Sequence, residues 1–179
     1  MEFNIQQSQK LQGLFIITPS ISSDLRGNIW TSFYQQEIEK LLPNGLYFKH
    51  DKFSQSSYNV LRGIHGDSKS WKYVTCVYGS ILQVVVDCRK ESKTYLQYEK
   101  FIINKESQKL LLIPPNMGNA YYVLSHEAVY HYKYAYSGEY AEVNEQFTYA
   151  WNDERIAIDW GIKNPILSER DIIAKDSQC

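Results

Sequence analysis

The feature that most constrains the fold is a long series of short apolar segments between residues 47 and 136, each followed by a turn signal. Turns such as Tyr78–Ser80 and Pro114–Asn116 separate the segments at a spacing of roughly 8–12 residues, which is typical of sandwiches, barrels and jelly rolls. Fifteen tyrosines bring the aromatic content to 15%, and aromatic side chains favour pleated strands. The predicted strands are Tyr47–Phe53, Asn59–His65, Trp71–Tyr78, Ser80–Asp87, Gln97–Ile103, Gln108–Ile113, Asn119–Leu124 and Ala128–Tyr136. We therefore predict an all-β fold.

The two ends of the chain add a few further elements. Apolar residues predict strands over Gly13–Thr18 and Asn28–Tyr34, and apolar spacing predicts a short helix over Gln35–Leu42. Ser168 is a suitable N-cap for a final helix, because a hydroxyl can accept a hydrogen bond from a backbone N–H of the first turn. No repeat or low-complexity linker interrupts the sequence, so residues 1–179 are predicted to form one domain with a few short peripheral helices.

Charge and cysteine usage narrow the partners and the compartment. Charged residues make up 22% of the chain and the formal net charge is -1, so no nucleic acid or anionic membrane surface is expected as a partner. The N-terminus has only about five consecutive apolar or small residues, too few for a signal peptide or a membrane span. The cysteines Cys76, Cys88 and Cys179 are widely spaced and odd in number, which predicts a reducing, cytoplasmic location without disulfides or a zinc site.

The segment around His65 combines residues that could carry chemistry. A free imidazole titrates near neutral pH, so His65 could serve as a base, although a lone histidine is more often a hydrogen-bonded residue at a strand end. Arg62 could bind a phosphate and Lys72 could stabilise an oxyanion, or both could be surface charges. Strict alternation places Arg62 and His65 on opposite faces of a strand. A shared site therefore requires a twist or a bulge at Gly63.

A wall of tyrosines is the second candidate feature. In the strand Ala128–Tyr136 the side chains of one face are Tyr130, Tyr132, Tyr134 and Tyr136, and those of the other face are His131, Lys133 and Ala135. Each phenol taken alone is best interpreted as core packing, but a phenol can also donate a proton to a carbanion. No His-x-His pair with a later carboxylate is present, so no metal ion is predicted.

Taken together, the motifs resemble one family. Eight short motifs occur in the family's order from about Asp24 to Asp171. The first four are DLRG at 24–27, FSQSSYNVLRGIH at 53–65, VVVDCRKES at 84–92 and IPP at 113–115. The last four are VLS at 123–125, YK at 132–133, WNDERIAIDW at 151–160 and ILSERD at 166–171. The chain thereby resembles the dTDP-4-dehydrorhamnose 3,5-epimerase family of nucleotide-sugar epimerases. The resemblance implies a cupin-type jelly-roll barrel that requires no cofactor.

The resemblance also implies catalytic roles. His65, in the LRGxH motif, corresponds to the family base, and Asp171, in the LSxxD motif, corresponds to its carboxylate partner. Tyr132 corresponds to the acid on the opposite face of the sugar, and Lys72 to the lysine that stabilises the enolate. In a 4-keto sugar the C3 and C5 protons lie beside the carbonyl, so their removal gives an enolate, and inversion requires two groups on opposite faces.

Further residues are implied to bind the substrate: Arg26 and Arg62 at the nucleotide phosphates, with Ser54, Lys133, Asn119 and Thr31. Two of them depart from the family, since Asn119 replaces a histidine and Thr31 replaces a glutamate that contacts thymine. Gln83 replaces an aspartate, and the loop between His65 and Lys72, which contains Lys69, is shorter than in the family. An amide cannot titrate, so these changes leave open whether C3 alone or both carbons are inverted.

The implied function is the epimerisation of a nucleotide-activated 4-keto sugar in bacterial capsule synthesis. The departures suggest a nucleotide sugar that differs from the family's, and the general likeness of the chain to the branch that acts on GDP-4-keto-heptoses implies that substrate. The alternatives are a nucleotide-sugar 3,4-ketoisomerase and a non-catalytic sugar-nucleotide binding module. Family members are dimers that exchange N-terminal strands, so a homodimer is implied, in which the apolar segment Leu14–Ile17 could add to the sheet of the partner subunit.

Overall fold

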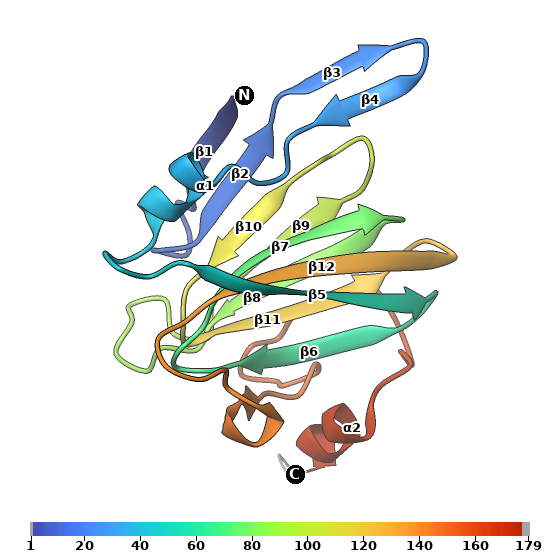
Figure 1. Cartoon of the computed structure of the whole chain (residues 1–179). Coiled ribbons are helices and arrows are strands. Elements are labelled where there is room, and N and C mark those ends of the chain that lie inside the picture. Colours follow the sequence, from blue (N-terminus) through green and yellow to red (C-terminus); the bar gives the residue numbers. More distant parts are fainter. Residues whose placement is uncertain (1, 177–179) are drawn as a thin grey trace.

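The computed structural model describes residues 2–176 and contains two packed antiparallel sheets (Figure 1). In spatial order, the larger sheet contains β1 (Phe3–Gln7), β2 (Phe15–Pro19), β10 (Leu110–Ile113), β7 (Trp71–Tyr78), β12 (Glu127–Ala135) and β5 (Phe48–Ser57). The smaller sheet contains β13 (Phe147–Thr148), β6 (Leu61–Gly66), β11 (Met117–Val123), β8 (Ile81–Asp87) and β9 (Tyr98–Ile103). A separate hairpin consists of β3 (Ile21–Asp24) and β4 (Gly27–Trp30).

The all-β prediction is confirmed. All eight strands predicted between residues 47 and 136 are present, and Trp71–Tyr78 has the predicted bounds. The strands β1, β3 and β13 were not predicted, because their sequences are short and largely polar and so lack a clear apolar alternation. The predicted strand Asn28–Tyr34 ends earlier, at Trp30.

Short helices lie at the periphery, as predicted. The segment Gln35–Leu42 forms α1 (Gln35–Ile38) followed by the 3-10 helix η1 (Glu39–Leu41), and a second 3-10 helix, η2 (Val143–Glu145), follows β12. The final helix is α2 (Glu169–Asp176). Its first turn is capped by Ser168, whose hydroxyl accepts a hydrogen bond from the backbone N–H of Asp171 at 3.3 Å.

Two apolar layers fix the positions of the strands. Between the sheets, fully buried side chains such as Val74, Val85 and Leu111 pack together. On the outside of the smaller sheet, Ile156 and Trp160 of the C-terminal segment cover a second cluster. Full burial of one such side chain stabilises the fold by about 1.5–3 kcal/mol. The C-terminal segment is thereby held across the sheet, and its end carries α2 to β6.

Within the single chain the N-terminal strands pair with the chain's own sheet, and the strand exchange between subunits stays a prediction. Strand β2, which contains most of the segment Leu14–Ile17, pairs with β1 on one side and with β10 on the other, so this segment is not a free edge. The exposed element is instead the hairpin β3–β4, which projects from the body of the molecule (Figure 1). All of its strand residues are exposed, including Ile29 at 74%.

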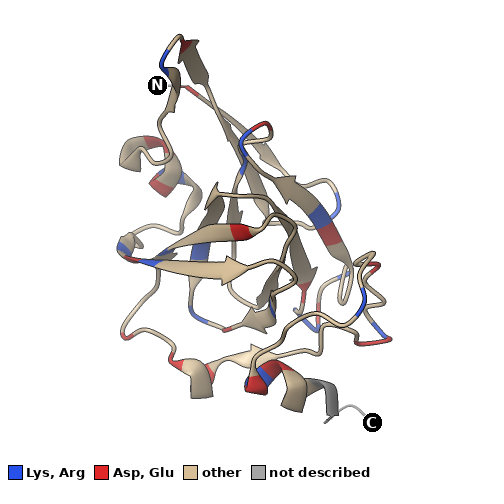
Figure 2. Cartoon of the chain, turned by 90° about the vertical axis from the view of Figure 1, so that its right-hand side faces the viewer, with Lys and Arg blue, Asp and Glu red and all other residues tan. Residues whose placement is uncertain are grey.

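The surface carries charges of both signs. Figure 2 shows acidic and basic residues interspersed along the same elements. No helix within residues 2–176 has the length and apolar character needed to cross a membrane. Cys76 and Cys88 are buried free thiols, whereas Cys179 lies outside the described residues.

Candidate active site

A bulge in β6 brings Arg62 and His65 to the same face of the sheet. Tyr121 of β11 pairs with Arg62, but Asn119, two residues earlier, pairs with His65, three residues further along β6. Gly63 lies at this irregularity with a φ of 124°, and a Cβ there would lie 2.4 Å from the Cβ of Ala120. Only glycine fits this close approach. Arg62 and His65 can therefore contribute to one site, as the sequence analysis required of a bulge at Gly63.

His65 forms a hydrogen-bonded pair with Asp171. The distance from His65 Nε2 to Asp171 Oδ1 is 2.5 Å, and the second carboxylate oxygen accepts a hydrogen bond from Ser168 at 2.8 Å. Burial raises the pKa of Asp171, but hydrogen bonding to His65 and the charge of His65 outweigh burial, so the pKa lies below its ordinary value. A carboxylate only accepts hydrogen bonds, so this contact requires a proton on Nε2 of the imidazole. Nδ1 is left with its lone pair free to accept a proton.

The tyrosine wall faces the interior between the sheets. Ring centroids of Tyr130 and Tyr132 lie 4.6 Å apart, and those of Tyr132 and Tyr134 lie 5.8 Å apart. Burial raises the pKa of Tyr132, and the Ser54 hydroxyl and the charge of Arg62 lower it by less. The Tyr132 phenol therefore keeps its proton at neutral pH and can act only as a donor.

Arg62 has an open guanidinium. Its Nε donates a hydrogen bond to Ser56 at 3.0 Å, while its terminal nitrogens make no hydrogen bond to any residue between 2 and 176. The residue is exposed, and it lies close enough to Tyr132 to influence the pKa of the phenol. A planar guanidinium held at one nitrogen can offer the others to a phosphate.

Lys72 is buried within the same interior. It lies opposite Tyr134 in the sheet, and its Nζ lies 3.4 Å from Asp67 Oδ2. Burial lowers the pKa of Lys72 and the nearby Asp67 carboxylate opposes this effect. Asp67 also fixes the loop, because its other oxygen accepts the backbone N–H groups of Lys69 and Ser70 at 2.9 and 2.6 Å.

The short loop between His65 and Lys72 has a second anchor. The Lys69 ammonium donates a hydrogen bond to Glu145 of η2 at 2.5 Å. Both side chains are about two-fifths exposed, so the pair contributes little to stability by itself. It does attach the loop to the segment that follows β12. This contact gives Lys69 a structural role that the sequence alone did not indicate.

Three predicted substrate-binding residues lie apart from this interior. Arg26 is at the tip of the hairpin β3–β4, where it pairs with Asp24 and its side chain is 90% exposed. Thr31 directly follows the hairpin. Lys133 points to the outer face, 2.7 Å from Asp51, because alternation turns it away from Tyr132. Within one chain these side chains do not join the cluster.

Some supporting residues were not identified from the sequence. Arg170 donates hydrogen bonds to Thr148, Gln146 and the carbonyl of Phe147 at 2.6, 3.1 and 3.2 Å. Because Thr148 pairs with His65 in the sheet, Arg170 locks α2 against the histidine strand. Its position next to Asp171 was the only available signal. Asp67, two residues after His65, is the other supporting residue of this kind.

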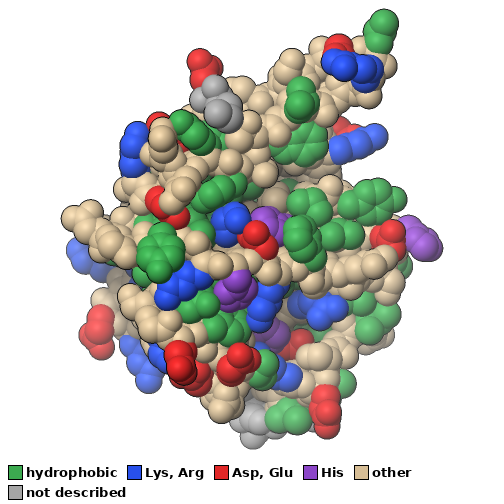
Figure 3. Space-filling model, viewed as in Figure 1, with side chains coloured by type: hydrophobic (Ala, Val, Ile, Leu, Met, Phe, Trp, Pro, Cys, Tyr) green, Lys and Arg blue, Asp and Glu red, His purple; other side chains and the backbone are tan. Residues whose placement is uncertain are grey.

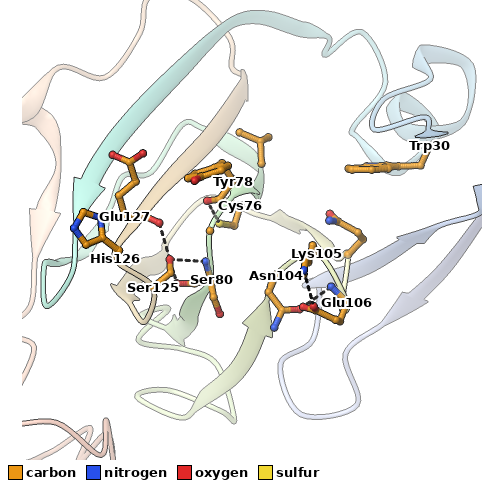
Figure 4. A pocket seen from close by; sticks show the side chains of 13 residues that line it. Trp30, Cys76, Tyr78, Ser80, Asn104, Lys105, Glu106, Ser125, His126 and Glu127 are labelled. Carbon is orange, nitrogen blue, oxygen red and sulfur yellow. Dashed lines mark hydrogen bonds and ion pairs between the residues drawn. The ribbon is translucent and has the colours of Figure 1, made fainter. Parts of the chain in front are cut away.

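A cavity of about 450 Å³ lies at another place, beside the loops that contain His126 and Asn104 (Figure 4). Its lining includes Trp30, Tyr78 and His126 but none of the predicted catalytic residues. Because it lacks these residues, this cavity is separate from the candidate active site. Among residues 2–176 there is no group of three His, Cys, Asp or Glu side chains placed to hold a metal ion.

Comparisons with known proteins point in one direction. The model of the family described as dTDP-4-dehydrorhamnose 3,5-epimerase matches residues 8–178. The dTDP-4-dehydrorhamnose 3,5-epimerase of Salmonella typhimurium is 34% identical and the match covers 90% of this chain and 88% of that protein. The dTDP-4-dehydrorhamnose 3-epimerase of Streptomyces niveus is 31% identical, with 90% and 78% covered. A solved structure, the dTDP-6-deoxy-D-glucose-3,5-epimerase of Legionella pneumophila in complex with dTDP-4-keto-L-rhamnose, superposes with a TM-score of 0.86 at 34% identity, covering 97% of this chain and 92% of that one.

Proposed function

Because the chain belongs to the dTDP-4-dehydrorhamnose 3,5-epimerase family, a family of isomerases, we propose that it epimerises GDP-4-keto-heptose. Inversion occurs at C3, and inversion at C5 is the second outcome to test, since the relatives include both a 3,5-epimerase and a 3-epimerase. The product would serve capsular or surface polysaccharide synthesis.

The observation that carries the proposal is the His65–Asp171 pair in an interior lined by the half-buried side chain of Tyr132. In the proposed reaction, Nδ1 of His65 takes the proton from the carbon beside the ketone. Asp171 stabilises the resulting imidazolium through the 2.5 Å hydrogen bond to Nε2. Tyr132 then delivers its proton to the opposite face of the carbon, which inverts the configuration.

The cations of the site suit the charges of the proposed substrate. Lys72, buried and 3.4 Å from Asp67, is a compact charge that can stabilise the enolate oxygen. Arg62, held at one nitrogen by Ser56, can bind a diphosphate oxygen with its free nitrogens. The enolate and the diphosphate are both anionic, so the buried Lys72 can neutralise the first and the exposed Arg62 the second.

The substrate is inferred from departures at two ends of the site. Thr31 offers a hydroxyl where the family has a glutamate, so it lacks the carboxylate that would accept hydrogen bonds from thymine. Asn119 and Gln83 offer amides where the family has a histidine and an aspartate. Changes at both the base-reading and sugar-reading ends favour a nucleotide and a sugar other than dTDP-6-deoxyhexose.

We further propose a homodimer, because Arg26 cannot reach the interior of its own chain. The hairpin that carries it is exposed on both strands, with Leu25 fully exposed at its tip. Figure 3 shows hydrophobic side chains among histidine, basic and acidic ones on the face formed by the larger sheet, where Phe53 and Val77 are 65% and 47% exposed. A second copy on this face would place Arg26 of the partner subunit near the phosphates.

The test is product analysis with two substrates. GDP-4-keto-heptose and dTDP-4-keto-6-deoxyglucose are each incubated with the protein in deuterated water, and C3, C4 and C5 are followed by NMR. The proposal predicts inversion with deuterium incorporation on the GDP sugar and a much lower kcat/KM on the dTDP sugar. Movement of the ketone from C4 to C3 would identify a ketoisomerase instead. Binding without any deuterium incorporation would identify a non-catalytic module.

A further inference from the structure

A chain of neutral hydrogen bonds crosses the interior next to His65. Its members are Gln83 of β8, Asn119 of β11 and Tyr130 of β12, which are 0%, 6% and 0% exposed. The Tyr130 hydroxyl donates to Gln83 Oε1 at 2.5 Å, and Gln83 Nε2 donates to Asn119 Oδ1 at 2.7 Å. Buried polar groups of this kind rigidify a core only when their hydrogen bonds are satisfied.

The backbone fixes the orientation of the Gln83 amide. Its Nε2 lies 3.0 Å from the carbonyl oxygens of both Val84 and Ala120. A carbonyl oxygen can only accept, so the amide nitrogen must face these two groups and the amide oxygen must face Tyr130. A flipped Gln83 would place its oxygen against two carbonyl oxygens and would leave the Tyr130 hydroxyl without its acceptor.

The orientation of Gln83 then fixes Asn119. Asn119 Oδ1 accepts from Gln83 Nε2 at 2.7 Å, so Nδ2 is turned away from Gln83; the Tyr130 hydroxyl, whose one proton lies closer to Gln83 Oε1, is 3.3 Å from the same oxygen. Within residues 2–176, Nδ2 makes no hydrogen bond, and it is not sealed from solvent. Asn119 lies directly opposite His65 in the sheet, with both side chains on the same face. The Nδ2 group is therefore an open donor beside the base.

We propose that Gln83 is a positioning residue that holds Asn119 as a fixed hydrogen-bond donor to an oxygen of the sugar, and that this side of the interior takes no part in proton transfer. This inference rests on the proposed function. An amide does not titrate, and burial keeps the Tyr130 phenol protonated by raising its pKa. The site should therefore prefer a sugar with an acceptor oxygen beside Asn119 Nδ2. His65 is then the single base for every carbon that reacts.

The first test uses the protein without substrate. In protein labelled with ¹⁵N-asparagine, the side-chain NH₂ signals of Asn119 are compared between the wild type, Gln83→Met and Tyr130→Phe. The Gln83→Met substitution removes the donor to Oδ1, so the Asn119 signals should shift or broaden, and Tyr130→Phe should shift them less. Unchanged signals in a folded Gln83→Met protein would overturn the positioning role. If that variant does not fold, Gln83→Glu replaces it, and the Asn119 signals should then shift as the pH rises and the new carboxyl loses its proton.

The second test measures KM and kcat for the 4-keto sugar. In Gln83→Met the loss of one aligned hydrogen bond should raise KM about tenfold at every pH. In Gln83→Glu the new carboxyl can donate to Oδ1 only while protonated, so KM should rise with pH through its ionisation. A wild-type KM without this pH dependence, in folded Gln83→Glu protein, would overturn the inference. If the Asn119 signals shift as expected but the wild type converts no sugar, the proposed function fails while the positioning role stands.

Discussion

Two buried aspartates, Asp171 and Asp87, use the same side chain in different ways. Asp87 is fully buried, and its two oxygens accept five hydrogen bonds from Arg89, Ser92 and Thr94, all within a few residues along the chain. Asp171 is almost as buried, but its main partner is the imidazole of His65, 106 residues away. The first carboxylate is saturated by groups that do not titrate near neutral pH.

The difference shows how a buried charge serves structure or reaction. The Asp87 carboxylate ties one loop to the end of β8, and it has no partner with a free proton-accepting atom. The Asp171 carboxylate leaves Nδ1 of its histidine open. Asp171 should therefore matter for activity more than for stability, and Asp87 should matter for stability more than for activity.

The largest effect is expected for His65→Ala. Removing the base should lower deuterium incorporation at every reacting carbon by a factor on the order of 10³–10⁴, because the variant lacks the imidazole that takes the proton in the proposed reaction. The measurement is NMR of the sugar in deuterated water. His126→Ala, at an exposed histidine beside the cavity of Figure 4, is the matched control and should retain full activity. Comparable losses in both variants would break the assignment.

A smaller effect is expected for Asp171→Asn. The amide cannot stabilise an imidazolium by charge and can hold the ring in the wrong tautomer, so kcat should fall about 10²-fold. Glu169→Gln, on the exposed side of the same helix, is the control and should leave kcat unchanged. If Asp171→Asn keeps wild-type kcat, the pair with His65 has only a structural role.

The opposite pattern is expected for Asp87→Asn. Burial raises the pKa of Asp87, but the hydrogen bonds from Arg89, Ser92 and Thr94 outweigh it and lower the pKa to about 2. A depression of this size corresponds to about 2 kcal/mol at neutral pH. Asp87→Asn should lose this free energy of unfolding while kcat per folded molecule stays near that of the wild type. A chemical denaturation series with Asp159→Asn, an exposed aspartate, as control measures it.

The smallest effect is a difference in acid sensitivity. Because the folded-state pKa of Asp87 is below its unfolded value, the stabilisation is complete above about pH 4 and is lost as the pH falls towards about 2. The wild type should therefore lose free energy of unfolding over this window more steeply than Asp87→Asn. Equal slopes would contradict the structural role of this carboxylate.

Much of the fold was predictable because alternating strands leave a clear pattern. The strand Trp71–Tyr78 and the cap at Ser168 were read correctly, and the solved structures confirm the cupin-type jelly roll. The hairpin β3–β4 lacked such a pattern, because its exposed strands need no apolar face.

The site was predictable only in part. The motifs indicated His65 and Asp171, which the structure brings together, but the shared face of Arg62 and His65 depends on a bulge that alternation cannot predict. The hydrogen bonds around Gln83 join three strands that are distant in sequence. Such contacts follow from the register of the sheets, which a single sequence does not specify.

In the proposed reaction His65 and Tyr132 act on opposite faces of one carbon, and Tyr132→Phe separates these two steps. The sugar is incubated with this variant in deuterated water, and the recovered substrate and the inverted product are analysed separately. We predict that the recovered substrate gains deuterium beside the ketone, because His65 still removes and returns the proton, while inversion falls at least about 10²-fold. Inversion at the wild-type rate, or recovered substrate without deuterium, would contradict the roles proposed for His65 and Tyr132.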